Sequence, residues 1–90
     1  MRALVVPNPL GHGIHALWLD LRGLGQACEV ETYTEAYVLV HKQALALSGS
    51  GMLQLSMDTR AWPSGALFLK VRVLGPGGMD EKLLKVFLIP

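Results

Sequence analysis

Histidines are the first residues in this sequence whose types and spacing could support chemistry. His12 and His15 form an H-x-x-H pair, and His41 stands alone. On a β-strand, residues three apart point to opposite faces of the sheet, so this pair cannot chelate one metal ion. Two histidines also fall short of the three or four protein ligands of a typical zinc site. We therefore expect no bound metal and no cofactor.

Hydroxyl and carboxylate side chains give no stronger catalytic pattern. Ser64, His41 and Asp58 compose a serine–histidine–acid trio on paper, but no nucleophile-elbow sequence surrounds the serine. Glu29 and Glu31 lie two residues apart and share a strand face, which the intervening apolar residues explain as a solvated face. The glycines match neither the dinucleotide-binding nor the P-loop spacing. The sequence therefore predicts no catalytic residue, no small-molecule substrate and no enzyme.

Length and composition limit the protein to one small domain, residues 1–90. The chain has 90 residues, of which 51% are hydrophobic and 17% charged, and its formal net charge is +1. This balance disfavours disorder and gives no electrostatic basis for nucleic-acid binding. Cys28 is the one cysteine, so no internal disulfide forms, and we expect its thiol on an apolar face. The N-terminus is not typical of a signal peptide, so an export signal is expected elsewhere.

Alternation of apolar and polar residues with a period of two dominates the chain. Turn signals rich in glycine and proline separate the alternating runs, as expected of half-buried strands. Seven strands are predicted, at about 2–6, 14–21, 27–34, 36–42, 51–57, 66–74 and 81–89. The segment 42–49 is interpreted as a strand end and a loop. This spacing predicts an all-β, immunoglobulin-like β-sandwich of antiparallel strands.

Three aromatic or apolar features have alternative interpretations. Trp18 falls on the outer face of its strand and Trp62 precedes a proline, so each is either exposed for a partner or recruited to plug an open end of the core. Plugging is the favoured interpretation for both. The last segment, 81–89, is nearly continuous in apolar residues, which favours a central strand covered on both faces over one with a partner outside this chain.

The order of these elements resembles the C-terminal immunoglobulin-like sorting domain of proteins exported by the type IX secretion system, also called the Por secretion system. It is also similar to the C-terminal domain of the flagellar hook-capping protein. The stretches that carry the resemblance cover most of the chain: "VVPNP" (5–9), "LWLDL" (17–21), "VETY" (30–33), "YVLV" (37–40), "LQLSMDTRAWPSGALFLKV" (53–71) and "KVFLI" (85–89).

The resemblance implies a non-catalytic module at the end of a larger exported protein. Such a module directs its covalently linked cargo through the periplasm and across the outer membrane, to be secreted or held at the cell surface. Recognition by secretion-apparatus proteins is expected through the last strand and its edge. The residues expected to define the signal are Pro7, Asn8, Pro9, Gly65, Lys82, Lys85, Val86, Phe87, Leu88 and Ile89.

Two alternatives and one departure from the family pattern accompany this hypothesis. A structural or adhesive spacer, or an assembly scaffold, fits the same fold, and a homodimer through a strand edge is a further option. The family commonly has glycine where this chain has Tyr37. Because tyrosine does not readily adopt a positive φ, we expect the hairpin to differ there.

Overall fold

The computed structural model describes residues 2–6 and 10–90, the side chains of 5–6, 22–26 and 47–50 excepted. Strands account for most of this part of the chain, and it contains no helix. The strands are β1 (Arg2–Val6), β2 (Ile14–Thr34), β3 (Leu39–Asp58), β4 (Gly65–Gly75) and β5 (Gly78–Leu88). All pairings between strands are antiparallel.

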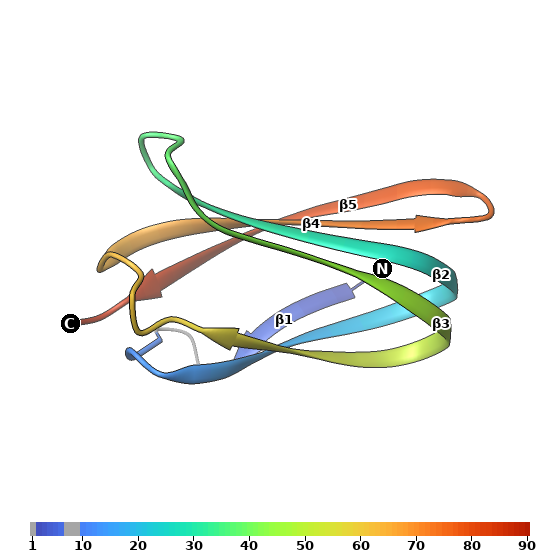
Figure 1. The fold of residues 1–90 in the computed structure, drawn as a ribbon, viewed down its shortest axis with the longest axis horizontal. Coiled ribbons are helices and arrows are strands. Elements are labelled where there is room, and N and C mark those ends of the chain that lie inside the picture. The colour runs from blue at the N-terminus through green and yellow to red at the C-terminus, as the bar shows by residue number, and fades with distance from the viewer. Residues whose placement is uncertain (1, 7–9) are drawn as a thin grey trace.

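The two long strands run through both layers of a sandwich. In the first layer, residues 14–21 of β2 lie between β1 and residues 51–58 of β3. In the second layer, residues 27–34 of β2 lie between residues 39–46 of β3 and β4, and β5 follows β4. Figure 1 shows both long strands turning from one layer into the other on the right of the view. The predicted antiparallel β-sandwich is therefore confirmed.

The predicted boundaries were wrong at the two bends. The glycine-rich stretches 22–26 and 48–51 were expected to separate strands, and 42–49 to hold a strand end and a loop, yet β2 and β3 continue through them. The pairing register of β2 with β3 shifts between Leu21 and Gly25 and again between Gly25 and Ala27. Such irregularities let a strand bend sharply without losing its partner. Glycine here allows a corner rather than the end of a strand.

The core lies between the inner faces of the two layers, as the alternation predicted. Leucines and valines from both layers make up most of it, and its fully or nearly buried members are Leu10, Leu17, Leu19, Leu21, Cys28, Val30, Leu55, Met57, Trp62, Leu67, Leu69, Val71, Val73, Val86 and Leu88. Trp62 is 5% exposed and closes one end of this core, which confirms the plugging prediction. Trp18 is 36% exposed on the outer face of the first layer, so the same prediction was wrong for it.

β5 is an edge strand, contrary to the expectation of a central one. It follows β4 at the end of the strand order, and its side chains alternate between the two sides of the sheet. Val86 and Leu88 enter the core, whereas Leu83 is 62% and Phe87 49% exposed on the other side. The apolar run therefore reflects one buried face and one apolar outer face.

A buried threonine joins the first turn of the chain to the turn that precedes β4. The Thr59 hydroxyl accepts a hydrogen bond from the Gly13 amide (3.0 Å) and directs its proton toward the carbonyls of Gly11 (3.1 Å) and Gly13 (3.0 Å). The Thr59 amide donates to the Gly13 carbonyl at 2.8 Å. The other fully buried threonine, Thr32, has no hydrogen-bond partner for its hydroxyl among the described residues.

These two threonines provide a matched pair of substitutions. Thr59→Val should lower the free energy of unfolding by about 1–3 kcal/mol, because it leaves the partly buried Gly13 amide without its acceptor and removes the hydroxyl's bonds to the Gly11 and Gly13 carbonyls. Thr32→Val should raise it by about 1 kcal/mol, because it replaces a buried, unsatisfied hydroxyl with a methyl group of similar volume. Urea denaturation of both variants and of the wild type measures the difference. Equal effects of the two substitutions would contradict the hydrogen-bond assignment.

The β2–β3 hairpin has a strained tip. The Thr34 amide donates to the Val38 carbonyl (2.9 Å), and the Tyr37 amide donates to the Thr34 carbonyl (3.0 Å). These bonds close a three-residue connection, a type of hairpin that places its last residue in the left-handed region. Tyr37 occupies that position with a φ of 63°. Tyrosine was not expected to adopt a positive φ readily, yet Tyr37 takes the conformation usually left to glycine.

Replacement of Tyr37 by glycine should stabilise the protein. A left-handed conformation costs a residue with a side chain about 1–2 kcal/mol, and the ring of Tyr37 is 85% exposed, so little packing is lost with it. We expect Tyr37→Gly to raise the free energy of unfolding by about 1 kcal/mol, measured by urea denaturation. Tyr37→Ala keeps the strain and serves as the control. A Tyr37→Gly protein no more stable than Tyr37→Ala would contradict the strain.

Candidate binding surface

Charged side chains cross the middle of the outer face of the second layer. The Arg72 guanidinium contacts Glu31 at 3.0 Å, Glu29 at 3.5 Å and Glu81 at 3.0 Å, so it joins β2, β4 and β5. Hydrogen bonding to Glu81, followed by the charges of Glu31 and its neighbours, raises the pKa of Arg72. Glu29 and Glu31 do share a face, as predicted. Because these side chains are partly exposed, solvent screens the ion pairs and each contributes little to stability.

A groove of about 350 Å³ lies on one side of these charges, beside the β2–β3 hairpin. Tyr33, Tyr37, Phe68, Lys70 and Leu83 line it, from β2, the hairpin tip, β4 and β5. The pairing register sets Tyr33 opposite Phe68 and places Lys70 opposite Leu83, which brings the four strand residues together. We call this depression the Tyr37 groove. The three aromatic rings suit an apolar group of a ligand, and the ammonium group of Lys70 suits a negative charge beside it.

Contacts with neighbouring side chains hold the rings of Tyr33 and Phe68 that line the Tyr37 groove. The Tyr33 hydroxyl donates to a carboxylate oxygen of Glu31 at 2.9 Å, and this hydrogen bond raises the pKa of Tyr33. The Lys85 ammonium lies over the rings of Phe68 (5.9 Å) and Phe87 (5.3 Å). These cation–π contacts continue the aromatic surface from the groove onto β5. Tyr33 and Phe68 are thus each fixed by a contact with a neighbouring charged side chain.

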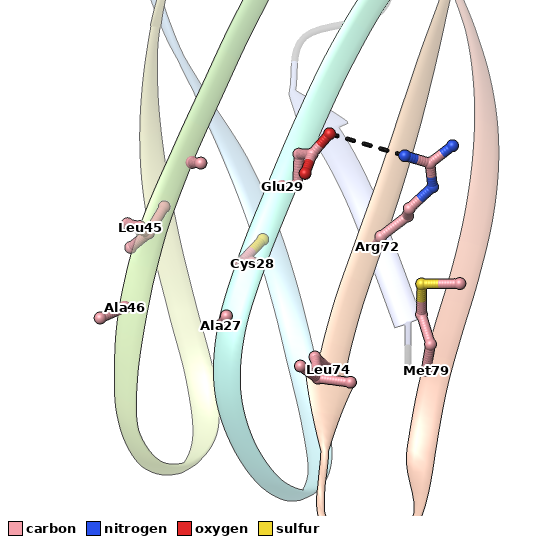
Figure 2. A pocket seen from close by; sticks show the side chains of 9 residues that line it. Ala27, Cys28, Glu29, Leu45, Ala46, Arg72, Leu74 and Met79 are labelled. Atoms are coloured by element: carbon pink, nitrogen blue, oxygen red, sulfur yellow. Dashed lines mark ion pairs between the residues drawn. The ribbon is translucent and has the colours of Figure 1, made fainter.

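A second depression, of about 500 Å³, lies on the other side of the charged band (Figure 2). Its lining includes small side chains, such as Ala27 and Ala46, together with the larger Leu74 and Met79. Cys28 borders it but is buried. Figure 2 shows the Glu29–Arg72 ion pair at its upper margin. Its charged lining residues, Glu29 and Arg72, are paired with each other at that margin, and the other lining residues form an apolar surface without groups that would fix a ligand's orientation.

The predicted signal residues do not form one cluster. Pro7, Asn8 and Pro9 lie outside the described residues. Lys82 and Lys85 lie on opposite sides of β5, because three residues along a strand reverse the face. The next predicted residues divide in the same way: Val86 and Leu88 of β5 are buried, whereas Phe87 of β5 and Ile89, just after the strand, are exposed. The buried members, Val86 and Leu88, cannot contact a partner while the sandwich is intact.

Gly65 has a backbone role. It begins β4 with a φ of 113°, a conformation that a residue with a side chain rarely adopts, and it follows directly on Pro63 and Ser64. A methyl group in place of its hydrogen would meet no atom within 4 Å, so backbone freedom and not space requires glycine here. Gly65 therefore serves the turn that leads into β4.

The trio written from the sequence does not assemble. Ser64 pairs with His12, whose Nε2 lies 3.2 Å from the serine hydroxyl, while His41 packs against the ring of Trp62 at a centroid distance of 5.7 Å. Asp58 is bound by Arg60 at 2.6 Å, which lowers the pKa of Asp58 to about 2. Each member thus has a different neighbour.

The H-x-x-H pair also uses its nitrogens elsewhere. His12 Nδ1 lies 3.2 Å from the Thr59 carbonyl, and His15 Nε2 lies 2.7 Å from the Gly11 carbonyl. Among the residues that the structure describes, no group of three or more histidine, cysteine, aspartate or glutamate side chains is placed to hold a metal ion. These histidines fasten the turn before β2.

Sequence reasoning missed the Tyr37 groove. Tyr33, Phe68 and Lys70 were placed on outer faces by the alternation, but nothing in the linear pattern indicates that they lie side by side. The one signal available was tyrosine at a position where glycine was expected. A residue that is unfavourable for its turn is a reason to look for a contact made by its side chain.

The fold and this surface define a small antiparallel β-sandwich with an aromatic groove on one outer face. No family model, no curated protein and no solved structure matches the chain. Within the described part of the chain, no helix is long and apolar enough to cross a membrane.

Cys28 should be unreactive in the folded protein. Its side chain is almost fully buried, and burial raises the pKa of the thiol, so both access and the thiolate fraction are low. We expect its reaction with Ellman's reagent at pH 8 to be at least roughly tenfold slower than in the urea-unfolded chain. Immediate stoichiometric reaction in native buffer would show that the core opens between Cys28 and its neighbours.

Proposed function

We propose that this domain is a non-catalytic C-terminal sorting module, which directs a covalently linked cargo across an outer membrane to the cell surface. The observation that carries the proposal is the position of β5. The last strand lies at the edge of the sheet with an exposed, apolar outer face that includes Leu83 and Phe87, and the exposed Ile89 follows directly after the strand. An exposed apolar strand at the edge of a sheet is a surface suited to a protein partner.

The hairpin tip adds support for the resemblance. The family pattern has glycine at the position of Tyr37, and glycine is expected where φ is positive. Tyr37 has a φ of 63°. The agreement concerns a backbone conformation and is independent of the apolar pattern on which the resemblance rests.

Recognition is proposed to use side chains rather than strand addition at the end of β5. The Leu10 amide donates to the Phe87 carbonyl (2.7 Å), and the Ile89 amide donates to the Leu10 carbonyl (2.8 Å). Residue 10 therefore occupies the backbone edge there, and a strand from a partner or from a second copy would have to displace it. This covered edge is also what favours the alternative function, a structural or adhesive spacer.

An export assay tests the proposal in a bacterium that has a type IX secretion system. A periplasm-directed fluorescent reporter joined to the N-terminus of the domain should reach the cell surface or the medium. Deletion of 81–90 is unsuitable, because Val86 and Leu88 fill the core. The double variant Leu83→Ser, Phe87→Ser should instead keep the fold and retain the reporter in the periplasm.

Trp18→Ser, an exposed aromatic residue on the other layer, is the matched control and should export normally. The sorting hypothesis fails if the wild-type fusion stays in the periplasm although the domain is folded and protease-resistant. It also fails if the reporter reaches the surface equally well without the domain. Either result would favour the spacer.

A further inference from the structure

We propose that the Tyr37 groove binds an extended segment of a partner protein that presents, on one face, an apolar or aromatic side chain and a carboxylate two residues away from it. The inference deepens the proposed function and rests on it, because it names the chemistry that a secretion partner would offer. Its physical basis is the strained tyrosine, the charge of the groove and the apolar surface that continues from it along β5.

The first argument is the position of the Tyr37 ring. The backbone of the hairpin would favour glycine here, and the ring is 85% exposed, so it adds little to the packing of the free protein. The hairpin projects beyond the body of the sandwich, at the upper left of Figure 1. A strained residue whose side chain stands at the lip of a groove is typical of a contact residue. Its ring would cover a side chain inserted between it and Phe68.

The second argument is the charge of the groove. Lys70 is its one charged lining residue, and the nearest carboxylates are engaged: Glu31 by Tyr33 and Arg72, and Glu81 by Arg72 at 3.0 Å. Lys70 lies 3.8 Å from Glu81, at the limit of an ion pair. Because an ammonium group has three hydrogen-bond donors, Lys70 can also donate to a second carboxylate that lies in the groove. An acidic segment therefore complements the surface, and a basic one does not.

The third argument concerns the size of the occupant. Small-molecule sites bury most of their ligand, whereas Tyr37, which lines one side of this groove, is itself 85% exposed. The apolar surface also extends past the groove through Leu83, 62% exposed, to Phe87. A peptide in an extended conformation can place one side chain in the groove and the next but one against β5. This continuity favours a chain segment over a compact ligand.

The test uses the acetylated and amidated hexapeptide Leu-Ser-Phe-Ser-Asp-Gly, whose leucine, phenylalanine and aspartate share one face when the peptide is extended, and the same peptide with lysine in place of aspartate. Titration of the isotope-labelled domain, followed by NMR, should shift the amides around Tyr33, Tyr37, Phe68 and Lys70. The aspartate peptide should bind about threefold more tightly than the lysine peptide, as expected for one partly exposed ion pair. Lys70→Gln should remove this preference.

Tyr37→Gly is the decisive variant, because it is expected to be more stable than the wild type, so a loss of binding cannot come from unfolding. It should weaken binding of the aspartate peptide about tenfold or more, as loss of an aromatic anchor does. Trp18→Ala removes an exposed aromatic residue from the other layer and should bind normally. Equal binding by Tyr37→Gly and wild type, no binding of either peptide, or a preference for lysine would overturn the inference.

The inference and the proposed function can fail separately. Export of the reporter with no peptide binding at the groove would overturn the inference and leave the sorting function in place. Specific binding of the aspartate peptide by a domain that does not export the reporter would support the groove as a docking site and overturn the sorting function.

Discussion

The continuous pairing of β2 with β3 is the constraint on which the rest of the structure depends. The two strands stay antiparallel partners from Ile14 to Tyr33, through both layers, and bend together where the register shifts. This pairing sets which residues face inward in each layer, because successive side chains point to opposite sides. Leu17 and Leu19 in one layer and Val30 in the other meet in one core for that reason. β1, β4 and β5 then extend the layers from β2 outward.

The same alternation produces an outer face with three zones. Arg72 and its carboxylates occupy the middle of the second layer, with an aromatic groove on one side and a shallow apolar depression on the other. The charged band keeps the exposed apolar residues in two separate patches instead of one continuous surface. Rings such as Tyr37 and Phe87 are therefore exposed in small patches, and the centre of the face stays polar.

Local strain and local stabilisation lie at the same end of the molecule in different turns. Thr59 and His12 fasten the turns around 11–13 and 58–65 with hydrogen bonds, which makes them structural elements. The backbone of the β2–β3 hairpin is hydrogen-bonded, but among the described residues no such bond holds the Tyr37 ring, which is 85% exposed. The contrast separates polar residues that hold the fold from an aromatic residue whose position is unfavourable for it. It is the physical reason to place a contact site at the hairpin and not at the histidines.

The sequence by itself determined the fold class and the inward or outward direction of most strand residues. A period of two is a local property, so the inner faces of 14–21, 27–33 and 66–74 could be predicted without knowledge of any partner. Tertiary structure decided what depends on contacts between distant segments. It made corners of glycine-rich stretches that had indicated loops, left β5 at an edge and Trp18 at the surface, and brought Tyr33, Phe68 and Lys70 beside Tyr37. These results follow from which strands pair and in which register, and neither is encoded within any single run of residues.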